Sequence, residues 1–98
     1  MRIISIRKLK DHWALPGRGD SEEPLKAWHA IAKAASWKHF AQVKEQFRSA
    51  RAVGERVVFN IAGNKYRLVA FINYELQIIL VRFVGTHAEY DEVDVKNV

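Results

Sequence analysis

The chain has 98 residues, 49% of them hydrophobic and 11% aromatic, so its length and composition indicate one folded domain spanning residues 1–98 and exclude a disordered tail. It has no cysteine, which excludes disulfides and cysteine nucleophiles, and it shows neither a signal-peptide pattern nor the ~18-residue apolar run of a membrane span, so we expect a soluble cytoplasmic protein. Lysine and arginine number 16 against 11 acidic residues, a net charge of +5, which favours a polyanion or an acidic protein as partner.

The sequence begins with a short strand and a helix. Residues 1–4 are apolar and branched, which is typical of a strand. From Ser5 the apolar residues Ile6, Leu9 and Trp13 recur with the spacing of one helix face, and Pro16-Gly17 ends that helix.

Two more helices are predicted before the middle of the chain. After a polar loop at 17–23, Pro24 is expected as the first residue of a helix at 24–35, whose apolar stripe includes Trp28 and Ile31. Ser36 can then cap a short third helix. Its inward residues would be Phe40, Val43 and Phe47, and a loop through Gly54 follows.

The second half of the sequence predicts three antiparallel strands in the segments RVVFNIA, KYRLVAFIN and QIILVRFV. Gly63-Asn64 is a two-residue hairpin signal, because both residue types accept a positive φ. That turn sets Asn60 opposite Arg67 and Val58 opposite Val69.

A second turn at Glu75-Leu76 would set Val69 opposite Arg82. In that register Lys65, Arg67 and Arg82 project to one side of the sheet. The other side would carry Phe59, Leu68, Ala70 and Val81 and be covered by the amphipathic helices. We therefore expect an α+β fold with a small antiparallel-dominated sheet, N-terminal helices on one face and a short C-terminal helix.

The short C-terminal helix is predicted from the segment GTHAEYD. Thr86 and Glu89 have the spacing of a capping box, which starts a helix directly after the last strand. His87 and Tyr90 are three residues apart in this helix, so they lie on one face of it. An imidazole and a phenol are thus expected beside the cationic side of the sheet.

At these residues the sequence resembles the HigB family of toxins from type II toxin–antitoxin systems, which are mRNA endoribonucleases with a RelE-like fold. The segments VVFNIAGNKYRLVAFINY and VRFVGTHAEYD are the most specific parts of the resemblance, which extends over essentially the whole chain. Ala62 is a small departure, since glycine or a polar residue is common there. The positions that match the family pattern are Asn60, Gly63, Asn64, Tyr66, Arg67, Thr86, His87, Glu89, Tyr90 and Asp91.

The resemblance implies partners as well as an activity. Such a toxin cleaves mRNA, usually in the A site of the 30S subunit of a translating ribosome. It is silenced by a cognate helix-turn-helix antitoxin, and it meets operator DNA only through the complex with that antitoxin. The resemblance implies no contact with a membrane.

RNA cleavage by the ribose 2′-OH needs a base, positive charge at the phosphate and an acid for the departing 5′-oxygen, but no metal. We expect Arg67 to supply the charge, with Arg82 assisting, and His87 to transfer a proton. Tyr90 would orient His87, stack on a base or act as a second acid. Lys65 would contact a phosphate or serve as a base. Asn60 and Asn64 are candidate RNA contacts, although a cross-strand hydrogen bond and a turn role explain them better.

No cofactor is expected, since His12, His29 and His39 lack metal-ligand spacing. Structural explanations remain open for other residues: Tyr90 can pack on the sheet, and Arg82 can pair with Asp91. Two other functions also remain open. One is a non-catalytic RNA- or ribosome-binding module on the same scaffold, for which His87 is dispensable. The other is a decayed enzyme whose present role is to bind the antitoxin.

Overall fold

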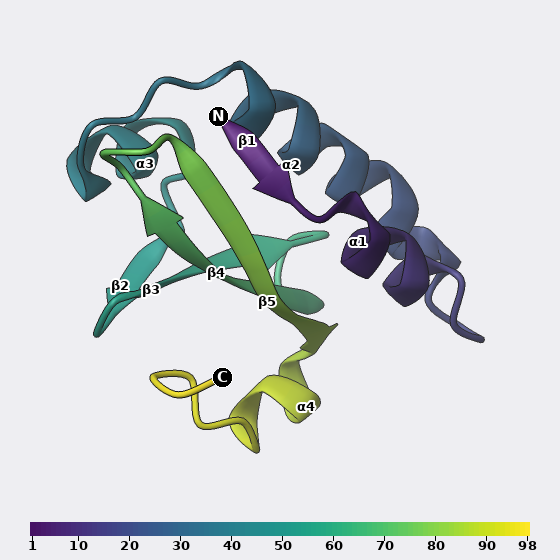
Figure 1. Ribbon diagram of the computed structural model, residues 1–98. Helices are drawn as coiled ribbons and strands as arrows, with labels where there is room; N and C mark the ends of the chain where they lie inside the picture. Colours follow the sequence, from purple (N-terminus) through teal and green to yellow (C-terminus); the bar gives the residue numbers. More distant parts are fainter.

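The computed structural model describes residues 1–98 and contains one five-stranded sheet with helices on both of its faces (Figure 1). In chain order the elements are β1 (Arg2–Ile4), α1 (Ile6–Trp13), the short 3-10 helix η1 (Gly19–Ser21), α2 (Glu22–Ala34), α3 (Phe40–Gln46), β2 (Arg51–Val53), β3 (Arg56–Ile61), β4 (Tyr66–Asn73), β5 (Ile78–Thr86) and α4 (His87–Asp91). The strand order is β1-β5-β4-β3-β2, with β1 parallel to β5 and every other pair antiparallel. The predicted α+β class is confirmed. None of the helices is long and apolar enough to cross a membrane.

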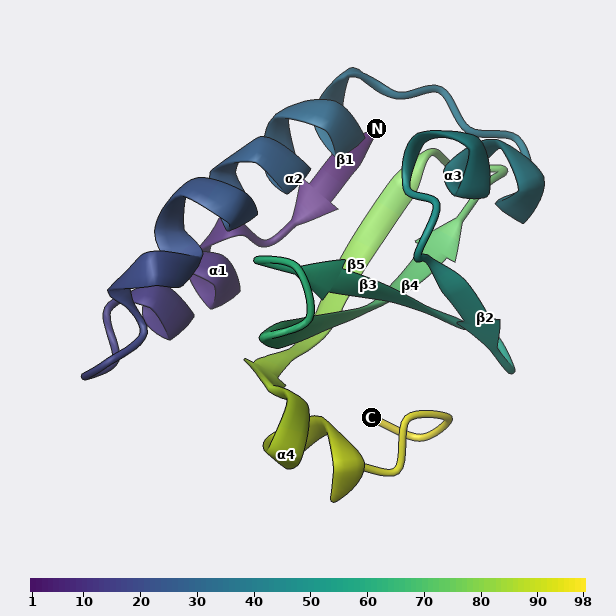
Figure 2. The ribbon, with the colours of Figure 1, turned by 180° about the vertical axis from the view of Figure 1, so that it is seen from behind.

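The N-terminal helices and the C-terminal helix lie on opposite sides of the sheet. Both views show α1, α2 and α3 above the sheet and α4 below it, with the C-terminal residues beside α4 (Figures 1 and 2). The main core lies between the sheet and the N-terminal helices. As predicted, Phe59, Leu68, Ala70 and Val81 belong to it, together with Leu9, Leu25, Trp28, Ala32, Trp37 and Val43.

A smaller cluster lies on the opposite face of the sheet. There Val58, Val69 and Tyr90 are buried together, and Phe83 packs against them. Val53, Val95 and Val98 pack against the same cluster. Burial of this apolar surface holds α4 and the residues after it on the sheet.

The start of α2 differs from the prediction. The helix begins at Glu22 and not at Pro24, so the proline is its third residue. The first four N–H groups of a helix have no partner within it, so a proline there removes no hydrogen bond. Trp28 is buried as expected, but Ile31 is 39% exposed and lies outside the covered stripe.

The predicted start of the third helix is wrong. Ser36 does not cap it; α3 begins at Phe40, and His39 occupies the N-cap position without a side-chain hydrogen bond. Packing of the apolar side chains onto the core sets this start, since Val43 is buried and Phe40 packs beside it. The segment predicted as a loop through Gly54 contains β2, a strand too short and too exposed to show a period in sequence.

The hairpin between β3 and β4 has the predicted register. Asn60 pairs with Arg67, and Val58 pairs with Val69. The backbone of the turn differs from the prediction, because the positive φ values belong to Ala62 (54°) and Gly63 (67°) and not to Asn64. The turn therefore holds a non-glycine residue in the left-handed region.

The register between β4 and β5 changes partway along the two strands. Ala70 pairs with Val81, in the predicted register, but Val69 pairs with Phe83 because an irregularity follows in the ladder. Arg82 is the extra residue of this bulge, so the prediction that it opposes Val69 is wrong. A bulge shifts the pairing by one residue, and the sequence pattern does not mark it.

Candidate active site

The candidate site is built around the N-terminus of α4, which follows β5 without a linker. Thr86 and Glu89 form the predicted capping box: the Thr86 hydroxyl accepts from the Glu89 amide, and the Glu89 carboxylate accepts from the Thr86 amide. The His87 amide donates to the carbonyl of Lys65 at 3.1 Å. The helix therefore begins directly against the β3–β4 hairpin turn.

The imidazole of His87 lies at the surface and contacts a carboxylate. Its Nδ1 is 3.1 Å from Oδ2 of Asp91, one helical turn along, and the two side chains are 49% and 59% exposed. Asp91 was not among the site residues predicted from the sequence. The i,i+4 spacing of the two residues is the signal that could have found it.

Arg67 lies beneath the hairpin turn and is only 7% exposed. Its guanidinium donates to the Asn64 carbonyl at 3.0 Å and to the Asn64 side-chain oxygen at 2.6 Å. It also donates to the Tyr66 carbonyl at 3.2 Å. No carboxylate forms an ion pair with it. The backbone of Arg67 pairs with Gly85, two residues before His87.

Tyr90 lies in the apolar cluster on the sheet, whereas His87 is exposed. Tyr90 is 8% exposed and packs against Val58 and Val69. Its hydroxyl accepts from a guanidinium N–H of Arg51 at 2.6 Å, and the same guanidinium lies 5.5 Å from the ring centroid. His87 and Tyr90 share one helix, but only the imidazole is accessible, because the phenol fills the small cluster.

Lys65 belongs to a different group of side chains from the one predicted. Its ammonium binds a carboxylate oxygen of Asp20, and the other oxygen of Asp20 accepts from the Tyr66 hydroxyl at 2.6 Å. Strand alternation set Lys65 beside Arg67, but a lysine in a turn is long enough to reach the other side of the sheet. The Lys65 contact, followed by that of Tyr66, lowers the pKa of Asp20, and the Asp20 contact raises the pKa of Lys65.

Of the remaining predicted RNA contacts, Asn60 and Asn64 both neighbour Arg67, whereas Arg82 has different neighbours. Arg82 is exposed, and its Nε donates to the main-chain oxygen of Val98 at 3.3 Å instead of pairing with Asp91. Asn64 holds the Arg67 guanidinium at the turn. Asn60 is half-buried beside Arg67 in the ladder.

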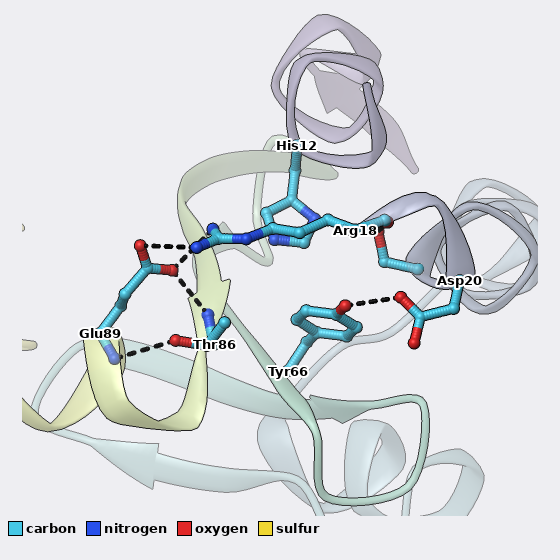
Figure 3. Close-up of polar contacts among 7 residues, drawn as sticks. His12, Arg18, Asp20, Tyr66, Thr86 and Glu89 are labelled. Carbon is cyan, nitrogen blue, oxygen red and sulfur yellow. Dashed lines mark hydrogen bonds and ion pairs between the residues drawn. The ribbon is translucent and has the colours of Figure 1, made fainter. Parts of the chain in front are cut away.

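A second group of polar residues lies in the segment before α2. It contacts α4 through Glu89 (Figure 3). Both guanidinium nitrogens of Arg18 donate to the Glu89 carboxylate, at 2.8 and 3.1 Å. These bonds, followed by the bond from the Thr86 amide, lower the pKa of Glu89. Sequence reasoning missed Arg18, since no pattern links a loop arginine to a glutamate 71 residues later.

The buried side chain of His12 is linked to Arg18 through Ser21. Its Nδ1 is 3.0 Å from the Ser21 hydroxyl, and Ser21 in turn donates to the Arg18 carbonyl at 2.7 Å. The His12 ring also meets the Tyr66 ring edge-on, with centroids 5.0 Å apart. Burial, followed by the charge of Arg18, lowers the pKa of His12.

No group of three or more histidine, aspartate or glutamate side chains lies together in a way that could hold a metal ion. The arrangement offers an accessible imidazole at the start of a helix whose first amide is bonded to the hairpin turn that also holds the Arg67 guanidinium.

Comparison with known proteins identifies a family that matches this chain. The HigB toxin family, described as the RelE-like toxic component of a toxin–antitoxin system, matches residues 21–93, so the first 20 residues lie outside the match. The mRNA interferase toxin HigB of Escherichia coli K12 is 50% identical over 34 residues, which are 35% of this chain and 33% of that protein. The mRNA interferases HigB of Escherichia coli O157:H7 and of Shigella flexneri match with the same identity and coverage. The match thus spans about one third of the length of these curated relatives.

Proposed function

The chain belongs to the HigB family of RelE-like toxins, and from this premise we propose that it is an mRNA endoribonuclease that uses the ribose 2′-OH as nucleophile. The 2′-oxygen attacks the adjacent phosphorus, and the bond to the 5′-oxygen of the next nucleotide breaks. The products are a 2′,3′-cyclic phosphate and a 5′-hydroxyl. The protein must supply proton transfer and positive charge, and no metal is required.

The observation that carries the proposal is the exposed pair of His87 and Asp91. Oδ2 of Asp91 lies 3.1 Å from Nδ1 of His87, and a carboxylate there favours a proton on that nitrogen and leaves Nε2 of the same ring to take or give a proton. Because half of the imidazole side chain is exposed, a phosphodiester can approach it. We assign proton transfer to His87 and orientation of its ring to Asp91.

Arg67 is the proposed source of fixed positive charge. A guanidinium that is 7% exposed and has no carboxylate partner has lost hydration without gaining a counter-ion, and an anion near the turn would stabilise it. Lys65 is the proposed phosphate contact. Its bond to Asp20 joins two side chains that are each about half exposed, and such surface pairs are weak enough to exchange for a phosphate.

The other predicted residues have supporting roles in this proposal. Burial of the Tyr90 ring opposes base stacking, so we assign Tyr90 to holding α4 on the sheet. Asn64 holds Arg67 in place. Arg82 and Asn60 remain proposed RNA contacts.

Mapping of transcript 5′ ends after brief induction in a growing bacterium tests the proposal. The wild type should create new 5′-hydroxyl ends, and His87→Ala should remove them; the loss of one proton-transfer group is worth about 10²- to 10⁴-fold in rate. His39→Ala is the matched control, because His39 is exposed and its side chain has no hydrogen bond. Cleavage by His87→Ala at the wild-type rate would contradict the assignment of His87.

A non-catalytic RNA- or ribosome-binding module is the second candidate, and the hydrogen bonds that fix Arg67 on the turn favour it. Growth arrest by both the wild type and His87→Ala, with transcripts left intact, would identify such a module. The same experiment therefore separates the two functions.

We further propose that the cleavage occurs on the ribosome, in the A site of the 30S subunit, and that a cognate helix-turn-helix antitoxin silences it and carries the complex to operator DNA. Incubation of the purified chain with an mRNA, with and without ribosomes, tests the first point. Cleavage of naked mRNA at the same rate would remove the requirement for the ribosome. Co-expression with the protein encoded by the neighbouring gene tests the antitoxin.

A further inference from the structure

A chain of hydrogen bonds connects the buried face of α1 to the N-terminus of α4. The Ser21 hydroxyl has one hydrogen, which it donates to the Arg18 carbonyl at 2.7 Å. Ser21 therefore accepts from Nδ1 of His12, which lies 3.0 Å away. Ser21 is fully buried and His12 is 4% exposed, so the backbone of Arg18 is held by groups that do not move freely.

The Arg18 side chain extends from this support to Glu89. Both oxygens of the carboxylate are engaged by its guanidinium, and a bidentate pair of this kind fixes orientation as well as distance. The Glu89 oxygen nearer to Arg18 also accepts from the Thr86 amide at 2.8 Å. One carboxylate thus closes the capping box of α4 and fastens the helix to the segment before α2 (Figure 3).

The position of the His87 imidazole depends on how firmly the N-terminal end of α4 is held. His87 is the first residue of α4, and the only side chain that its imidazole contacts by an ion pair, that of Asp91, belongs to the same five-residue helix. The backbone bond from His87 to Lys65 is the other restraint on the start of the helix. Tyr90 holds the other end of α4 on the sheet, so loss of the Arg18 bonds would loosen chiefly the first turn of the helix.

Resting on the proposed function, we infer that Arg18 is a positioning residue for the reaction: through Glu89 it fixes the first turn of α4 and so aims the His87 imidazole at the scissile phosphate. Arg18 lies outside residues 21–93, the part of the chain that matches the family. The side chain acts through another residue and does not contact RNA. Its removal should lower the cleavage rate at saturating RNA and leave RNA affinity unchanged.

Single-turnover cleavage by purified Arg18→Gln tests the inference. We expect the saturating rate to fall about 10- to 100-fold, as for other small misplacements of a reacting group, with an RNA Kd equal to that of the wild type. Arg18→Lys should recover part of the rate. Arg7→Gln is the matched control, because Arg7 is exposed and forms no ion pair or side-chain hydrogen bond.

A double-mutant cycle with Glu89→Gln separates positioning from a direct RNA contact. If Arg18 acts through Glu89, the double variant loses no more rate than Glu89→Gln alone. Rate losses that multiply, or a weaker RNA Kd with an unchanged saturating rate, would overturn the inference. So would a wild-type rate for Arg18→Gln.

Amide hydrogen exchange gives a readout that does not need activity. In Arg18→Gln the amides of α4 should exchange faster than in the wild type, while those of β4 should not change. This measurement holds even if His87→Ala still cleaves RNA, so failure of the proposed function and failure of the inference can be told apart. Unchanged exchange in α4 would overturn the inference. Circular dichroism of each variant checks that it is folded.

Discussion

His87 and Asp91 contact each other across one turn of α4, with 3.1 Å between the imidazole Nδ1 and the carboxylate Oδ2. Both side chains are about half exposed, so water weakens the attraction of their charges. In the proposed reaction the contact would therefore act through geometry, by orienting the ring.

Replacement of Asp91 by asparagine should lower the cleavage rate without unfolding the protein. The amide can accept from Nδ1 but can also present its NH₂ group, which leaves the ring less well oriented. We expect a loss of about 10-fold at saturating RNA, within the range of partners that orient a functional histidine. Asp11→Asn is the control, since Asp11 is exposed on α1 and has no side-chain partner. An equal loss in both variants would argue against the role of Asp91.

Ala62→Gly should stabilise the protein. Ala62 has a φ of 54°, which is unfavourable for a residue with a Cβ atom, and glycine removes that strain at some cost in chain entropy. The net gain should be roughly 0.5 to 1 kcal/mol in the free energy of unfolding, measured by urea denaturation. Ala41→Gly, at an exposed position of α3, should instead destabilise by about 1 kcal/mol. A loss of stability in Ala62→Gly would contradict the turn geometry.

Gly85→Ala should destabilise the protein and loosen α4. A Cβ atom at Gly85 would lie 2.6 Å from Cζ of Phe83 and 2.9 Å from Oε1 of Glu89. Both neighbours would have to shift, which we expect to cost about 1 to 3 kcal/mol. Gly19→Ala is the matched control, because nothing lies within 4 Å of its Cβ position. Equal melting temperatures for the two variants would show that the space at Gly85 is not limiting.

His12 should make the stability of the protein depend on pH just below neutrality. Its pKa is lowered from 6.5, mainly by burial and then by the charge of Arg18, while Glu89 and Asp20 oppose the shift. Below pH 6.5 the unfolded chain therefore binds a proton more readily than the folded one, and stability falls as pH decreases towards the folded-state pKa. Above pH 6.5 this contribution is fully present.

Melting temperatures measured between pH 7.5 and 5 check this prediction. The fall should be shallower in His12→Gln than in the wild type, and His39→Gln should follow the wild type. Burial also lowers the pKa of His29, so part of the dependence should remain in His12→Gln. Parallel curves for the wild type and His12→Gln would contradict the assignment.

The sequence predicted local features of the site better than the contacts between distant segments. The capping box of Thr86 and Glu89 and the pairing of Asn60 with Arg67 follow from spacing and turn chemistry within a few residues, and both are present. The bulge at Arg82 has no such signal, since one strand simply holds one residue more than its partner.

The side-chain contacts of the site were the least predictable part. Strand alternation placed Lys65 beside Arg67, but the ammonium binds Asp20 of η1, 45 residues earlier. Tyr90 was predicted near His87 from their spacing, yet the apolar cluster of Val58 and Val69 draws the phenol to the sheet. In both cases a partner from another segment decided where a long side chain lies.

The pairing of β1 with β5 restricts when the protein can fold during its synthesis. Arg2 is synthesised before its partner Ile78, and the helices α1 to α3 and the strands β2 to β4 lie between them in the chain. Contacts so distant in sequence form slowly and late. The β1 edge of the sheet can therefore be completed only after β5, the strand that leads into α4, has been made.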